Sequence, residues 1–518
     1  MGSQGKAKEG DASKGPAKPV VLAVGAAALS LLFVIHIMLG LPIGVPGEWW
    51  IEYRTRLPGI GAVAFLIVCA VCLIGGAALL DRFPHRSMKA HAGAIAAVFL
   101  LYAVFLFAAV RCGPEGAFEM VAPAFKWDAA GLFRQEAAPI ENAREYLSGF
   151  PRRLGEYGRP ERYHETVRVN NNPPGTTMVF YSARRIAQRW AGLGLLASEA
   201  VFGLGFEPPD EEFAGTVLAC WMLFFGASLS LVPAILLVRR LGSGSPLLSA
   251  VVGLMAASMV MFLPGKDTLQ VFFFLWMAYF FARAREGRAW AWGAAMGACA
   301  AAAFFFTLAA AVVVLVLFLA ALWLDFVEGG TSRRREAVFW ASAAGGLAGG
   351  FMLLWVALGY NSLASLFACY RNHALFYEHF PRTYWKWLLV NPWEFAMFLG
   401  GPLVAMVMAA SWRGGRISVE GCSSCRAVLM AAVAVLVLLN ISGKNASEVA
   451  RLWVFFMPLL TLPAAALVSR RDGGVTTLVI IAAMQAAYVT LMCIYLDVWR
   501  IEALMQEIAP MGGAPFPR

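Results

Sequence analysis

The run VVLAVGAAALSLLFVIHIMLGLP, from Val20 to Pro42, decides the fold class of this chain. A helix needs about 20 apolar residues to cross a bilayer, and this run is too long for the core of a signal peptide. Similar runs recur along the chain, which is 60% hydrophobic and 14% charged. Soluble proteins average about 45–50% apolar and about 25% charged residues. We therefore expect an all-α polytopic membrane protein.

The basic residues between the apolar runs predict a topology. Lysines precede the first run, and basic loops favour the cytoplasm, so the N-terminus is expected to be cytoplasmic. Counting gives about 13 spans, within roughly 12–14, and one large extracytoplasmic loop, 111–211. The expected spans are 20–41, 60–80, 91–110, 213–238, 246–263, 269–282, two within 289–325, then 337–358, 393–411, 427–441, 451–469 and 475–497.

This trace divides the chain into four parts. We expect a disordered cytoplasmic tail because the first residues are rich in Gly, Lys, Ala and Ser. A two-helix extension precedes a transmembrane catalytic module, and a last helix and tail follow it. The parts are 1–19, 20–90, 91–470 and 471–518.

Charge and cysteine content limit the partners. The net charge of +10 lies mostly in loops expected in the cytoplasm, so it indicates orientation and contact with anionic membrane lipids. No basic stripe with interleaved aromatic residues stands apart from the membrane runs, which argues against nucleic acid. Cys422 and Cys425 form a single CxxC, which is a weak signal for zinc or a redox centre.

Two amphipathic patterns lie in the large loop. Apolar residues recur at helical spacing from Ile140 to Leu154 and from Val179 to Trp190, with charged residues between them. Both patterns predict short helices in the plane of the membrane interface. The alternative is a small soluble cap that packs on itself.

Polar residues gather in four gaps that the trace places on one side of the membrane. In so apolar a chain, ionisable groups at one face indicate a reaction site or a conduction path. Three gaps contain Lys266–Asp267, Arg371–Asn372–His373, and Lys444 with Glu448 and Arg451. The large loop contains Asp128 and Asn172–Pro173–Pro174–Gly175.

Each feature also has a structural interpretation. A surface ion pair with a helix cap would also explain Lys266–Asp267. Snorkelling of the side chain to lipid head groups would explain Arg451. The structural alternative for Asp128 is a solvated acid in a loop, and for the Pro-Pro-Gly run it is a junction between a loop and a helix. The aromatic residues of the expected loop 360–392 suit an interface belt, a sugar or a prenyl chain. Their joint placement favours a shared site.

These elements together resemble the GT-C superfamily of integral-membrane glycosyltransferases over about residues 111–470. Members include the protein mannosyltransferases, the aminoarabinose transferase of lipid A and the RgtA/B/C/D-like group. The resemblance rests on the early Asp128, the two loop helices, Asn172–Pro173–Pro174–Gly175, the Lys266–Asp267 turn and the run Glu448–Val449–Ala450–Arg451. The chain departs from the pattern where many bacterial members have His in place of Asn172. Asp128 also lacks an adjacent acid, and the first two spans are additional.

The resemblance implies transfer of a sugar from a polyprenyl-phosphate donor to an extracytoplasmic lipid, glycan or protein, with inversion. Asp128 is then the candidate base. A divalent metal is compatible with the sequence but not required by it. The expected location is the bacterial inner membrane. The candidate substrate-binding residues are Arg371, Lys444 and Arg451 for the phosphate, with Lys266 and His373 next, and Asn172, Asp267, Asn372 and Glu448.

Two other functions remain open. A transporter or lipid flippase would place charges near the bilayer midplane and show repeats with broken helices, whereas most charges here lie at the ends of runs. A polysaccharide polymerase or ligase also has a large outside loop. No Rossmann or Walker fingerprint occurs, which argues against a nucleotide-sugar donor. The sugar, the acceptor and the oligomeric state do not follow from the sequence.

Overall fold

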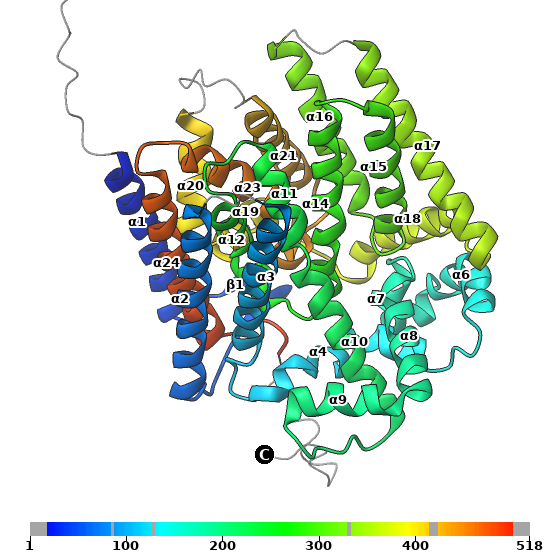
Figure 1. The fold of residues 1–518 in the computed structure, drawn as a ribbon. Helices are drawn as coiled ribbons and strands as arrows, with labels where there is room; N and C mark the ends of the chain where they lie inside the picture. Colours follow the sequence, from blue (N-terminus) through cyan, green and yellow to red (C-terminus); the bar gives the residue numbers. More distant parts are fainter. Residues whose placement is uncertain (1–17, 84–86, 127–129, 329–332, 414–422, 501–518) are drawn as a thin grey trace, which may run out of the picture.

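The computed structural model describes residues 18–83, 87–126, 130–328, 333–413 and 423–500. Over these residues the chain is a bundle of α-helices with one small sheet (Figure 1). Most of the expected N-terminal tail, and the end of the chain beyond residue 500, lie outside this part.

Seven segments within the described residues are long and apolar enough to cross a membrane. There are up to eight if α19 (Tyr384–Leu399) and α20 (Gly401–Arg413), which meet at 105°, form one broken span. The chain is therefore a polytopic integral membrane protein, as expected, but the expected count of about 13 spans is not confirmed. The seven segments are α1 (Lys18–Met38), α2 (Ile60–Arg82), α3 (Met88–Val110), α10 with α11 (Glu211–Ser228 and Leu231–Arg240), α17 (Arg333–Leu358), α21 (Ser423–Ser442) and α24 (Gly474–Tyr495).

The other expected spans correspond to helices that are shorter, broken or less apolar than these seven. Backbone breaks are tolerated at membrane depth where protein satisfies the freed polar groups. Ser258 Oγ, for example, donates to the carbonyl of Ala450 (2.6 Å) beside two such breaks. These helices are α12 (Pro246–Leu254), α13 (Ala257–Met261), α14 (Lys266–Ala284), α15 (Ala289–Phe304), α16 (Ala310–Glu328), α22 (Val449–Leu452) and α23 (Phe456–Ser469).

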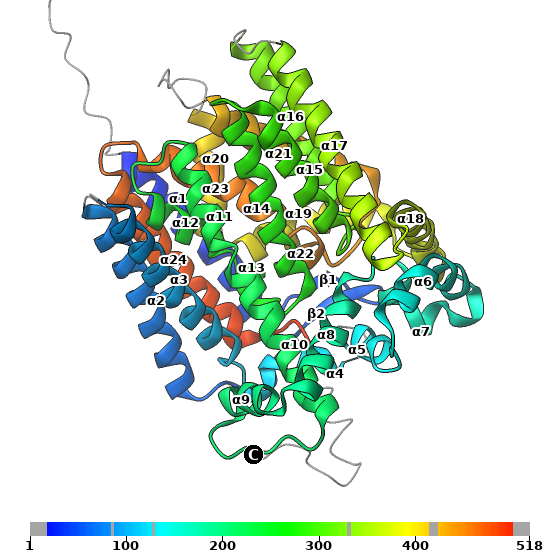
Figure 2. The ribbon, with the colours of Figure 1, turned by 45° about the vertical axis from the view of Figure 1, so that its right-hand side comes forward.

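The first and last long helices of the described chain pack side by side. Helix α1 packs on α20 and α24, and α2 packs on α3, α12 and α24 (Figures 1 and 2). Helix α15 packs on α17, and α16 packs on α21, on the other side. The N-terminal extension is therefore packed into the same bundle as the rest.

The large loop is mostly helical. The two expected amphipathic helices are present as α6 (Ala143–Tyr157) and α8 (Gly175–Arg189). Leu147, Phe150 and Leu154 of α6 are fully buried, and α6 contacts α18 while α8 contacts α10. Both helices therefore pack against helices from outside the loop. The loop also contains the 3-10 helix η1 (Gly116–Met120), α4 (Ala122–Phe125), α5 (Leu132–Ala137), α7 (Pro160–Asn170) and α9 (Ala191–Phe202).

A three-stranded antiparallel sheet was not expected from the sequence. It consists of β1 (Ile43–Val45), β2 (Trp49–Tyr53) and β3 (Leu496–Asp497), in the order β1-β2-β3. Gly44 makes the hairpin possible, because its φ is 128° and a Cβ there would lie 2.4 Å from the carbonyl oxygen of Trp49. The sheet joins the N-terminal extension to the residues that follow α24.

The expected loop 360–392 is wrong. It contains α18 (Ser362–His379) and the first turns of α19. Helix α18 begins after Asn361, whose side chain accepts a hydrogen bond from Ala364 N and so caps the helix. Its mixture of polar and aromatic residues hides the helical periodicity in the sequence.

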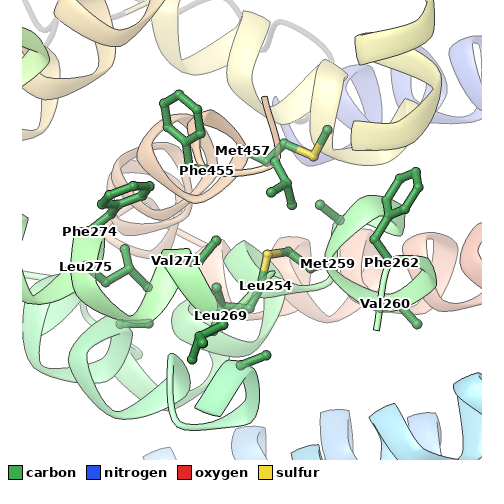
Figure 3. Close-up of a cluster of buried hydrophobic side chains, with 14 of the residues drawn as sticks. Leu254, Met259, Val260, Phe262, Leu269, Val271, Phe274, Leu275, Phe455 and Met457 are labelled. Carbon is green, nitrogen blue, oxygen red and sulfur yellow. The ribbon is translucent and has the colours of Figure 1, made fainter. Parts of the chain in front are cut away.

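A buried apolar cluster supports the start of α14. It includes Leu254, Phe274 and Phe455, which come from α12, α14 and the segment before α23 (Figure 3). The rings of Phe274 and Phe455 meet edge to face at 5.4 Å. This close packing holds the N-terminal half of α14 against the α22–α23 segment.

Candidate active site

A cavity of about 410 Å³ lies where the four expected polar gaps meet. We call it the main cavity. Part of its lining is polar and comes from α7, α14, α18 and the segment before α22. Another part is apolar and comes from Phe304, Leu308 and Val312 around the turn between α15 and α16, and from Leu439 of α21. The cavity is therefore amphipathic.

An ion-pair network forms the polar part. Lys266 Nζ lies 3.1 Å from Asp267 Oδ1, and Arg451 Nε lies 3.5 Å from Asp267 Oδ2. Arg451 also pairs with Glu448, and Arg168 Nη1 lies 3.3 Å from Glu448 Oε2. The network joins α14, α22 and α7, which are far apart in the sequence.

The Asn-Pro-Pro-Gly run completes this network. Lys266 Nζ donates to Asn172 Oδ1 (2.8 Å), and Asn172 Nδ2 donates to the carbonyl of Arg168 (2.7 Å). Gly175 N donates to the carbonyl of Phe305 (2.8 Å). A Cβ at Gly175 would lie only 2.6 Å from that oxygen. The glycine therefore lets α8 begin against the α15–α16 turn, which fixes Asn172.

The charges of the main cavity favour an anion. Burial alone would raise the pKa of the Glu448 carboxyl, but the charges of Arg168 and Arg451 outweigh it and hold the pKa at about 2. Burial also lowers the pKa of His373, so its ring is neutral at pH 7. The lining thus carries four cations against two carboxylates, a net charge of +2: Arg168, Lys266, Lys444 and Arg451, with Asp267 and Glu448.

The turn before α22 holds Glu448 and Arg451 in place. Ser447 and Glu448 have positive φ angles of 110° and 55°, a conformation that costs about 1–3 kcal/mol per residue. The buried carboxyl of Glu394, on α19, accepts a hydrogen bond from Ala450 N (2.9 Å). This contact and the Glu448 ion pairs stabilise the strained turn.

Most of the expected binding residues line the main cavity. The Lys266–Asp267 pair is buried and linked to Arg451, so it is not a surface ion pair. Arg451 is only 8% exposed, which excludes a snorkelling role. Lys444 is exposed and makes no salt bridge within the described part of the chain. The expected residues that line the cavity are Asn172, Lys266, Asp267, His373, Lys444, Glu448 and Arg451.

Arg371 and Asn372 do not line the main cavity. The buried Asn372 side chain donates to the carbonyls of Leu154 (2.8 Å) and Asn170 (3.0 Å), so it joins α18 to α6 and α7. Arg371 is exposed beside Gly155 of α6. The reason is the geometry of α18: side chains one position apart point about 100° apart, and of these three neighbours it is His373 that faces the cavity.

Asp128 lies outside the described residues, but Lys126 donates from Nζ to the carbonyl of Arg500 (2.9 Å). Arg168 was not expected from the sequence, because the large loop holds many arginines and α7 has no clear pattern. Glu394, a buried acid that accepts a hydrogen bond from Ala450 N, was not expected either, because it lies within an apolar run of the sequence.

A second cavity of about 270 Å³ adjoins the first. It is lined by Trp49 and Trp50 of the hairpin, by Trp499 near the end of the described chain, and by Arg382. Four residues line both cavities: Arg168, Phe376, Glu448 and Arg451. The ion-pair network therefore separates two neighbouring spaces. We call this one the tryptophan cavity.

Within the described residues, no three His, Cys, Asp or Glu side chains are grouped so that they could hold a metal ion. Asp267 and Glu448 are engaged by cations. Cys425 is buried, and its Sγ lies 3.4 Å from the carbonyl oxygen of Leu241, while Cys422 lies outside the described residues.

Comparison with known proteins gives one similar structure. No family model and no curated protein sequence matches this chain. Among solved structures, the chain is similar to ArnT from Cupriavidus metallidurans bound to undecaprenyl phosphate, with 13% identity and a TM-score of 0.42. The match covers 82% of this chain and 80% of that chain.

Proposed function

We propose that this protein is a membrane glycosyltransferase that moves a sugar from a polyprenyl-phosphate donor to an extracytoplasmic acceptor, with inversion at the anomeric carbon. The observation that carries the proposal is the amphipathic main cavity. A polyprenyl phosphate has a charged head and a long hydrocarbon tail. The ion-pair network suits the head, and the wall made by Phe304, Leu308, Val312 and Leu439 suits the tail.

The net charge of the cavity suits the chemistry. The donor is a phosphodiester with one negative charge. When the bond from the anomeric carbon to the phosphate oxygen breaks, the phosphate keeps the electron pair and its charge approaches −2. Fixed cations stabilise charge that develops in the transition state. Lys444 is our first candidate for the phosphate, because it has no salt bridge in the described residues. Arg168 and Arg451 are next.

The acceptor must lose a proton as its oxygen attacks. Asp128 is our proposed base, as the resemblance implies, and a carboxylate in this role takes the hydroxyl proton directly. Lys126, two residues earlier, contacts Arg500 at the tryptophan cavity.

A transfer assay tests the proposal. The purified protein is placed in lipid vesicles with a radiolabelled polyprenyl-phosphate sugar and an envelope lipid extract as acceptor. We expect the label to move to the acceptor and polyprenyl phosphate to be released. Broken helices such as α19–α20 also occur in transporters, so transbilayer movement of the donor is measured in parallel. Movement of intact donor without bond cleavage would establish the flippase alternative instead.

A further inference from the structure

We propose that the tryptophan cavity binds one sugar ring of an anionic acceptor and that the β1–β2 hairpin is part of this binding site. The inference rests on the proposed function, because it assigns the second substrate of the same reaction. It gives the N-terminal extension a role in substrate recognition.

The position of the tryptophan cavity fits a second substrate. It shares Arg168, Glu448 and Arg451 with the main cavity. Ligands in the two spaces would therefore lie on either side of one ion-pair network. A hydroxyl from one side then needs to cross only this boundary to reach the anomeric carbon on the other. Its volume of about 270 Å³ lies just below the range of about 300–1,000 Å³ for drug-sized ligands, which suits one ring rather than an oligosaccharide.

The lining has the chemistry of a saccharide site. A sugar ring has an apolar C–H face, which stacks on indoles, and a rim of hydroxyls, which need hydrogen-bond partners. Trp49, Trp50 and Trp499 supply the indoles. The ring of Trp499 meets Phe262 at 5.6 Å. Its buried Nε1 has no hydrogen-bond partner among the described residues, so it is a donor available to a hydroxyl.

Arg382 points to a negative charge on the occupant. It lines the tryptophan cavity and makes no salt bridge within the described residues. It makes two long hydrogen bonds of 3.4 Å, to Ser447 Oγ and the carbonyl of Pro381, and lies 6.0 Å from the centroid of the Phe376 ring. Glu448 also acts on its charge, but Glu448 is already paired with Arg168 and Arg451, so this partly buried cation favours an anion. Arg500, by contrast, is occupied by Glu52 at 3.2 Å. The acceptor is therefore a sugar with a carboxylate or a phosphate.

The hairpin is held rigidly enough to form a wall. At its tip, Glu48 accepts hydrogen bonds from Thr383 N (2.9 Å), Thr383 Oγ1 (2.6 Å) and Trp387 Nε1 (2.7 Å). At its other end, Tyr53 pairs with Leu496 of β3. The hairpin is therefore tied both to the start of α19 and to the segment that carries Trp499.

Binding of small sugars tests the inference without requiring catalysis. The probes are D-glucuronate and D-glucose 6-phosphate as anions and D-glucose as the neutral match, measured by calorimetry on the purified full chain. We expect both anions to bind more tightly than glucose, with the better of the two identifying the charged group. Arg382→Gln should abolish the preference for the anions, and Trp50→Ala should weaken all three probes by about 5- to 10-fold, as for a lost aromatic contact.

Matched controls separate this site from general effects. Arg371→Gln removes an exposed arginine outside both cavities, and Trp385→Ala removes an exposed tryptophan that lines neither. Both should retain wild-type binding. Equal binding of glucose and the anions, no measurable binding of any probe, or binding that Arg382→Gln and Trp50→Ala retain would each overturn the inference. Failure of the proposed function is distinguishable, because the wild type would then bind the anionic sugars but transfer none.

Discussion

Arg451 Nε lies 3.5 Å from Asp267 Oδ2, and this ion pair joins the first turn of α14 to the turn that precedes α23. The two residues are only 8% and 7% exposed. Breaking a buried pair is costly because it leaves a buried charge without a partner. The pair therefore fixes the spacing between Lys266 and Glu448, which flank it, and the cavity keeps its cations in place before a ligand arrives.

Lys444→Gln is expected to weaken binding of polyprenyl phosphate by about 1.5–3 kcal/mol, the value for a lost hydrogen bond to a charged group. Folding should be unaffected, because the side chain is exposed and makes no salt bridge in the described residues. The dissociation constant in detergent is the measurement. Arg371→Gln is the control and should bind as the wild type does. An equal loss in both variants would mean that the effect is general surface charge.

Glu448→Gln is expected to lower stability in a pH-dependent way. The carboxyl has a pKa of about 2 when folded, against 4.5 ordinarily, so its ion pairs contribute about 3 kcal/mol at neutral pH. A depressed pKa gives stability that is complete above about pH 4.5 and is lost as the pH falls towards 2. The difference in Tm between wild type and variant should therefore be constant from pH 6 to 8 and shrink below about 4.5. A difference that is the same at pH 3 and pH 7 would contradict this assignment.

The sequence predicted which polar gaps lie together, but not which of several adjacent residues within a gap faces the cavity. The gaps with Lys266 and Glu448 could be found because apolar runs surround them, and Asn172 because it begins the Asn-Pro-Pro-Gly run. Arg371 was preferred over its neighbours on chemistry, yet α18 turns it away from the cavity. Which residue faces the cavity depends on the rotation of α18 about its own axis, and the sequence predicted a loop here rather than a helix.

The rest of the site depends on contacts that no local pattern encodes. Arg168 is one arginine among many in the large loop, and only the packing of α7 brings it to Glu448. The hairpin is short, and the third strand of the sheet, β3, lies more than 400 residues further along the chain. Trp50 and Trp499 therefore meet in one cavity through tertiary structure alone.

The orientation of the chain remains a prediction, and cysteine labelling in intact cells tests it. Ser442→Cys and Arg371→Cys should react with an impermeant maleimide from outside, whereas Arg288→Cys should react only after the membrane is opened. All three positions are exposed. The background needs Cys72 replaced, because it is exposed too. If positions 442 and 288 label from the same side, the proposed extracytoplasmic site is wrong.

Asp128→Asn is expected to abolish sugar transfer while donor binding and folding persist. Asparagine has nearly the shape of aspartate but cannot accept the acceptor's proton, and loss of a general base typically slows a reaction by about 10²–10⁴-fold. Single-turnover transfer and the donor dissociation constant are measured on the same preparation. A lowered rate with unchanged donor affinity supports the base, whereas a loss of both indicates a role in binding or folding. Glu141→Gln and Glu145→Gln are the matched variants in the same loop and should transfer sugar normally. Near-normal turnover in Asp128→Asn, with a large loss in either glutamate variant, would move the base to that glutamate.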